Sequence, residues 1–135
     1  MVIISVDYGD ARTGIAACDK FQMLASPVCV IAEKDREKLI SEIAEIATER
    51  RAERFCVGLP KNMDGTLGFR ADACREFGEE LEKATSIPVV FRDERLTTVS
   101  AHGILNANDV RGKKRKNVVD AVSAVLILEE YLKTL

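Results

Sequence analysis

Short apolar runs and helical repeats alternate along the chain and predict a mixed α/β fold. β-branched and other apolar residues concentrate in five short segments that we expect to be strands, at residues 2–7, 14–18, 27–31, 54–59 and 87–91. Helical spacing of apolar residues predicts helices at residues 35–51, 69–84 and 118–132. We expect a short helix at residues 97–106 and a polar, basic loop at residues 107–116.

The order of these elements favours a mixed five-stranded sheet. The links at residues 8–13 and 19–26 are turn-like, so the first three strands should form an antiparallel meander. The later strands alternate with helices, which predicts parallel neighbours joined by right-handed crossovers. A ribonuclease H-like fold has this architecture, with helices on both faces of the sheet. A flavodoxin-like sheet is the nearest alternative, but it would need a helix between the first two strands.

Composition narrows the class of protein. The 135 residues are 47% hydrophobic and 31% charged, which is typical of one folded domain spanning residues 1–135 rather than a disordered or membrane-embedded chain. The net charge of −2 means that any affinity for nucleic acid must come from a local patch. Four cysteines without a Cys-x-x-Cys pair, and a single histidine, make a zinc site unexpected. We expect buried reduced thiols, no secretion signal, no membrane association and a cytoplasmic location.

Three acidic residues occupy positions that could carry chemistry. Asp7 ends the first predicted strand, where a turn begins. Asp93 and Glu94 follow the fifth strand, and because side chains alternate along a strand, only one of the two can point into a shared site. Asp120 lies in an otherwise apolar helix beside small residues. Each also has an ordinary structural interpretation, as a turn former, a solvated charge or an acid placed near a helix N-terminus.

If Asp7, Glu94 and Asp120 meet at one end of the central strands, they require a cation. Three carboxylates without partners repel one another, which raises their pKa values. Hard oxygen ligands suit Mg²⁺ or Mn²⁺, and two such ions ~4 Å apart can activate a water and stabilise a leaving oxygen in phosphodiester cleavage. The preferred fold therefore predicts a metal-dependent hydrolytic site made by these three residues.

A run of positive charge precedes the helix that carries Asp120. Its members are Arg111, Lys113, Lys114, Arg115 and Lys116. Solvated charge is the usual fate of such a run, but cations that overhang an acidic metal centre are what a polyanionic substrate needs. Arg12 and Arg95 are two further candidates for phosphate binding. Aromatic residues are only 5% of the chain, so recognition should favour the nucleic-acid backbone and shape over base stacking.

Four motifs resemble the signatures of the YqgF/RuvX family of Holliday-junction-resolvase-like proteins of bacteria. They are DYGDARTGIA at residues 7–16, VGLPKNMDGT at 57–66, DERLTT at 93–98, and KRK at 114–116 followed by Asp120-Ala121. The resemblance runs nearly end to end. It implies a ribonuclease H-like fold and a metal-dependent nuclease, with catalytic acids at Asp7, Glu94 and Asp120. It also implies cleavage of structured nucleic acid, most often in the maturation of the 5′ end of precursor 16S ribosomal RNA.

Two departures from the family pattern accompany this resemblance. Ala11 stands where the first motif often carries a second base, and Ser123 or Ala124 stands where related resolvases usually carry a fourth acid. A non-catalytic nucleic-acid-binding or ribosome-maturation adaptor on the same fold is therefore the alternative function. Nucleotide handling is a third hypothesis, because the turn after Asp7 resembles the first phosphate loop of sugar-kinase and actin-like ATPases. The expected partners are precursor ribosomal RNA or branched DNA, and the ribosome, bound by a monomer or a homodimer.

Overall fold

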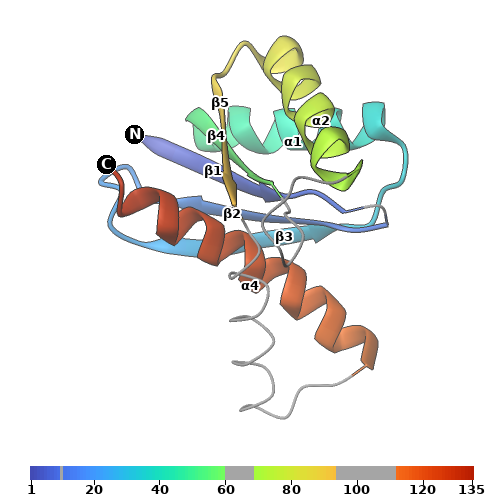
Figure 1. The fold of residues 1–135 in the computed structure, drawn as a ribbon. Helices are drawn as coiled ribbons and strands as arrows, with labels where there is room; N and C mark the ends of the chain where they lie inside the picture. The colour runs from blue at the N-terminus through green and yellow to red at the C-terminus, as the bar shows by residue number, and fades with distance from the viewer. Residues whose placement is uncertain (10, 60–68, 94–111) are drawn as a thin grey trace.

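A five-stranded mixed sheet forms the centre of the computed structural model, which describes residues 1–9, 11–59, 69–93 and 112–135 (Figure 1). The elements along the chain are β1 (Val2–Asp7), β2 (Thr13–Cys18), β3 (Ala25–Ile31), α1 (Arg36–Arg50), β4 (Ala52–Leu59), α2 (Phe69–Thr85), β5 (Val89–Asp93) and α4 (Gly112–Leu132). The strands lie in the order β3-β2-β1-β4-β5, so β1 is the central strand.

Strand pairing confirms the predicted topology. β1 pairs antiparallel with β2, and β2 pairs antiparallel with β3, which is the expected meander. β1 pairs parallel with β4, and β4 pairs parallel with β5. Because parallel strands end at the same edge of a sheet, the carboxyl ends of β1, β4 and β5 lie together.

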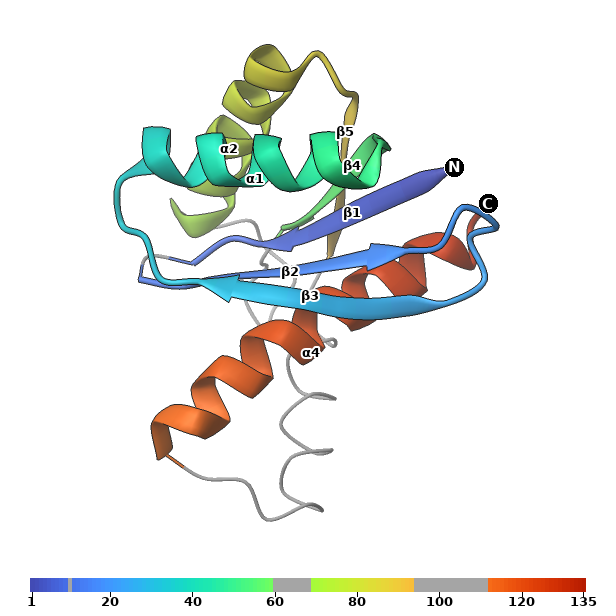
Figure 2. The same ribbon diagram turned by 180° about the vertical axis from the view of Figure 1, so that it is seen from behind.

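The alternation of side chains along β1 divides the core into two layers. Ile4 and Val6 pack with buried residues of α1 and α2 on one face of the sheet. Ile3 packs with α4 on the other face. Figure 2 shows α1 and α2 above the sheet and α4 crossing below it, so the prediction of helices on both faces is confirmed. Ser5 and Asp7 share the α4 face with Ile3, because side chains on a strand repeat every two residues.

Two hydrogen bonds determine how α4 lies on this face. Near the start of β1, the Arg54 guanidinium donates from Nη1 to the Tyr131 hydroxyl at 2.6 Å, and Arg54 is level with Ile3 in the sheet. Farther along β1, the Ser5 hydroxyl donates to the Ala124 carbonyl oxygen at 2.6 Å, and both residues are buried. The helix therefore runs antiparallel to β1, and its earlier residues lie toward the carboxyl end of the strand.

The start of α4 corrects one prediction. The helix begins at Gly112, so Lys113, Lys114, Arg115 and Lys116 are helical and do not lie in a loop. Lysine and arginine are good helix formers, but a run without apolar residues has no hydrophobic period from which a helix could be recognised. The predicted helix at residues 97–106, and residues 107–111 of the predicted loop, lie outside the described residues.

Other predicted boundaries were wrong by small amounts. β5 runs from Val89 to Asp93 rather than over residues 87–91, because its pairing with β4 starts at Phe55 and Val89 and ends at Leu59 and Asp93. Asp93 therefore belongs to the strand instead of following it. In the described part of α4, the buried apolar residues that pack on the sheet are Ala124, Ile127, Leu128 and Tyr131, and Val125 and Leu132 are partly buried against them. Since the second half of α4 is apolar nearly all round, its sequence alone could not single out this face.

The four cysteines, all in the described part of the chain, form no disulfide. Cys18, Cys56 and Cys74 are buried, as expected, whereas Cys29 is half-buried. Burial raises the pKa of the Cys56 thiol to about 12, so this thiol stays protonated and inert at neutral pH. Among the described helices, we find none whose length and apolar character would let it traverse a lipid bilayer.

We expect Ser5→Ala to lower the free energy of unfolding by about 1 kcal/mol, because the variant loses a buried hydrogen bond between sheet and helix. Urea unfolding followed by circular dichroism measures the change. Thr48→Ala is the control, because the Thr48 hydroxyl also donates to a carbonyl, that of Ala44, but is exposed and lies within one helix. That control should change stability by less than about 0.5 kcal/mol. Equal stability of Ser5→Ala and the wild type would contradict the docking role of Ser5.

Candidate active site

The carboxyl edge of the parallel strands carries Asp7, the first of the three predicted acids. Asp7 is the last residue of β1, is half-buried, and shares the α4 face with Ser5. Val6 is level with Val57 of β4, which in turn is level with Phe91 of β5. Two strand spacings, about 10 Å, therefore separate β1 from β5 at this level. Glu94 follows β5 directly and lies outside the described residues.

The backbone of α4 brings position 120 toward the same edge. Asp120 precedes Ala124 by four residues, about 6 Å along a helix, and Asp7 follows Ser5 by two residues, about 7 Å along a strand. Because Ser5 and Ala124 are hydrogen-bonded and α4 is antiparallel to β1, both steps lead in the same direction. Residues 7 and 120 therefore occupy corresponding places on the strand and the helix. The structure does not describe the side chain of Asp120.

The observed helix start removes one structural interpretation of Asp120. Asp120 lies eight residues after Gly112, more than two turns into α4, rather than one turn into a shorter helix. The favourable interaction of an acid with a helix N-terminus falls off within the first turn. Placement in the helix dipole therefore does not account for an acid at this position.

A tight turn holds Arg12 close to the end of β1. A Cβ added to Gly9 would overlap the backbone carbonyl oxygen of Arg12, so this turn requires glycine. The Tyr8 ring stacks on Phe77 of α2 with 4.2 Å between ring centroids and 5° between planes. This contact fixes the turn to the α2 side of the sheet. Arg12 itself is half-buried.

The predicted phosphate-binding residues divide between described and undescribed parts of the chain. Lys113, Lys114, Arg115 and Lys116 lie in the first two turns of α4, in the half of the helix that extends beyond the sheet (Figure 1). Arg95 and Arg111 lie outside the described residues. The first turn of α4 contains no acid, so these cations add to the positive end of the helix dipole. That arrangement costs the helix some stability and favours a bound anion.

The donor set fits a hard divalent cation. Asp7, Glu94 and Asp120 offer only carboxylate oxygens, which are ligands suited to Mg²⁺ or Mn²⁺. Ser123, one turn after Asp120, is 1% exposed, and its Oγ is the buried side-chain polar atom without a hydrogen-bond partner in the described part of the chain. The described side chains alone form no group of three metal ligands, since those of Glu94 and Asp120 are not among them.

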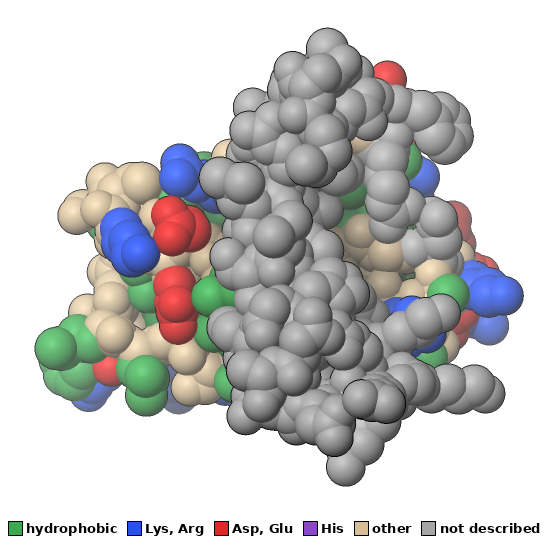
Figure 3. All heavy atoms as spheres, turned by 60° about the horizontal axis from the view of Figure 1, so that its bottom comes forward, with side chains coloured by type: hydrophobic (Ala, Val, Ile, Leu, Met, Phe, Trp, Pro, Cys, Tyr) green, Lys and Arg blue, Asp and Glu red, His purple; other side chains and the backbone are tan. Residues whose placement is uncertain are grey.

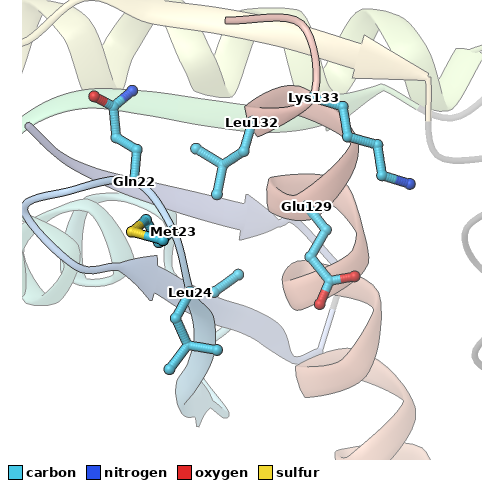
Figure 4. A pocket seen from close by; sticks show the side chains of 7 residues that line it. Gln22, Met23, Leu24, Glu129, Leu132 and Lys133 are labelled. Atoms are coloured by element: carbon cyan, nitrogen blue, oxygen red, sulfur yellow. The ribbon is translucent and has the colours of Figure 1, made fainter.

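A surface groove lined by both apolar and polar side chains lies at the opposite end of the sheet. Leu132 of α4 points toward Met23 and Leu24 of the β2–β3 turn (Figure 4). This turn adjoins the start of β1, where the amino terminus donates to the Lys20 carbonyl oxygen at 2.8 Å. In Figure 3, hydrophobic side chains gather at the end of the molecule that carries the chain termini, beside neighbouring acidic and basic ones. The groove is therefore separate from the edge that carries Asp7.

Comparison with solved structures identifies the fold. A RuvC structure from Thermus thermophilus in complex with a Holliday junction substrate aligns with a TM-score of 0.62, covering 99% of this chain and 96% of that chain at 14% identity. The Holliday junction resolvase of fowlpox virus aligns with a TM-score of 0.58 over the whole of both chains, also at 14% identity. The predicted ribonuclease H-like fold is thereby confirmed.

Comparison with curated sequences identifies the family. A protein of Halothermothrix orenii named "Putative pre-16S rRNA nuclease" is 45% identical over 98% of this chain and 94% of its own length. A protein of Lachnospira eligens with the same name is 41% identical over 99% of this chain and 98% of its own length. The sequence model of the family RuvX, described as Holliday junction resolvase, matches residues 1–134. The chain therefore belongs to the RuvX family, as the four motifs predicted.

Proposed function

We propose that this chain is a divalent-metal-dependent endonuclease that acts in the cytoplasm on structured nucleic acid, with the 5′ end of precursor 16S ribosomal RNA as its substrate. The names of its relatives, which match almost their whole length, support the RNA substrate. The observation that carries the proposal is the position of Asp7 at the end of the central strand, on the face crossed by the helix that contains Asp120.

In this proposal Asp7, Glu94 and Asp120 hold Mg²⁺ or Mn²⁺. A bound divalent cation lowers the pKa of a coordinated water and stabilises the charge on the leaving oxygen. The backbone position of Asp7 is rigid, because β1 has a paired strand on each side and a helix layer on each face. Such a rigid position keeps a ligand oxygen in place without further ordering during the reaction.

The basic residues bind and orient the substrate. Arg12, held in the turn after β1, would contact a phosphate next to the cleaved bond. The cations at the start of α4 would hold the substrate backbone beyond the sheet edge, helped by the positive end of the helix. Because these contacts reach phosphates rather than base edges, the shape of the nucleic acid would determine which bond lies over Asp7.

We expect Asp7→Asn to reduce cleavage by roughly a thousandfold, because losing a charged ligand removes several kcal/mol of charge stabilisation at the metal. Folding and substrate binding should change little. The measurement is a cleavage series with Mn²⁺ or Mg²⁺ on labelled precursor leader RNA, an RNA–DNA hybrid and a four-way DNA junction. Asp72→Asn is the matched control, since Asp72 is exposed on α2.

Two outcomes would redirect the proposal. Full activity of Asp7→Asn would refute the assignment of the acid site. A wild-type protein that binds the precursor RNA with Mn²⁺ present but does not cut any of the three substrates would support the adaptor alternative. The serine at position 123, where related resolvases usually carry an acid, is the feature that favours that alternative.

We expect simultaneous replacement of Lys113, Lys114, Arg115 and Lys116 by glutamine to weaken substrate binding. The slope of log affinity against log salt should become shallower by about 0.7 to 0.9 for each phosphate that the variant no longer neutralises. Fluorescence anisotropy at several salt concentrations measures this slope. The control replaces four exposed cations elsewhere, at Lys34, Lys38, Arg50 and Lys83. Equal slopes for the two quadruple variants would show that net charge, and not the start of α4, determines binding.

A further inference from the structure

Ser123 differs from the other polar residues in the core. Three polar residues are buried in the described part of the chain, namely Ser5, Thr13 and Ser123. The Ser5 hydroxyl donates to Ala124, and the Thr13 hydroxyl accepts from the Gly9 amide at 3.5 Å. Within the part of the chain that the structure describes, the Ser123 Oγ has no hydrogen-bond partner, so it lacks the bond to a carbonyl one turn earlier that helical serines often make.

An unpaired buried hydroxyl is unfavourable, because the group loses its bonds to water and gains none in return. An alanine would fill the same place in the helix without that cost. Retention of a hydroxyl here therefore indicates a partner from outside the chain. The position is small and enclosed, so that partner must be a water or an ion that reaches Ser123 from the neighbouring edge of the sheet.

The position of Ser123 indicates which partner fits. Ser123 precedes Ala124, whose carbonyl oxygen accepts a hydrogen bond from the Ser5 hydroxyl. Side chains on a helix lean toward its N-terminus, so the Ser123 hydroxyl leans toward the turn that contains Asp120 and toward the carboxyl end of β1. Residues three apart on a helix have Cβ atoms about 5–6 Å apart. At that separation both side chains can face the same ion. A neutral hydroxyl is a weaker ligand than a carboxylate, so it suits a hydrogen bond to one of the waters that Mg²⁺ retains.

We propose that Ser123 is a further residue of the cation site, whose hydroxyl hydrogen-bonds to a water in the hydration shell of the cation held by Asp7 and Asp120. This inference rests on the proposed function. Mg²⁺ retains several of its waters in protein sites, and polar groups that orient such waters affect how tightly the metal is held. Ser123 thus acts on the metal and on the reactive water without being a ligand itself.

The experiment compares Mn²⁺ binding by the wild type, Ser123→Ala, Asp7→Asn and the control Ser41→Ala. Ser41 is an exposed serine on α1, so the control reports the general effect of replacing a helical serine by alanine. Isothermal titration calorimetry should show about tenfold weaker Mn²⁺ binding by Ser123→Ala and unchanged binding by the control. Without metal, Ser123→Ala should melt at the same temperature as the wild type or higher. Mn²⁺ should raise the melting temperature of Ser123→Ala by less than it raises that of the wild type.

The outcomes separate this inference from the proposed function. Wild-type affinity for Mn²⁺ in Ser123→Ala, together with lost binding in Asp7→Asn, would overturn the role of Ser123 and leave the acid site standing. A lower melting temperature of metal-free Ser123→Ala would also overturn it, because the hydroxyl would then have a structural partner. Failure of the wild type to bind Mn²⁺ would overturn both proposals.

Discussion

The docking of α4 across β1 is the constraint on which the candidate site depends. The Ser5 hydroxyl reaches the Ala124 carbonyl oxygen at 2.6 Å, although 119 positions separate the two residues in the chain. A slip of β1 by one residue would exchange its two faces. Asp7 would then face the apolar layer formed by α1 and α2, where no α4 residue could meet it. The register of the central strand and the antiparallel direction of α4 together decide whether residues 7 and 120 can share a cation.

Polarity increases in the same direction along both partners of this contact. On the α4 face of β1, the order from the amino end is Ile3, Ser5, Asp7. Along α4, residues three or four apart become more polar toward the amino end, in the order Ile127, Ser123, Asp120. Because strand and helix run antiparallel, both series become polar toward the same edge. The apolar end fixes the packing, and in our proposal the polar end brings oxygen atoms together without breaking the core.

The sequence was sufficient to predict most individual strands and helices, but it was insufficient to predict how they contact one another. β1 was predicted at its observed bounds, because its apolar run ends at a carboxylate and a turn. The start of α4 was missed because the run from Lys113 to Lys116 lacks apolar residues. Neither the approach of position 120 to β1 nor the unpaired hydroxyl of Ser123 follows from local pattern. Both depend on a contact between residues more than one hundred positions apart.

The distribution of charge is compatible with the proposed binding of a polyanion by a chain whose net charge is −2. The cations are concentrated at the start of α4, where the helix dipole is already positive, and the first turn contains no acid to cancel them. Asp120, one of the three proposed acids, lies about one to two turns farther along the same helix, at the level of the end of β1 that carries Asp7. A phosphate held by the cations would therefore lie near the carboxylates, whose repulsion toward it a divalent ion would offset. In our proposal the metal would therefore serve substrate approach as well as the reaction.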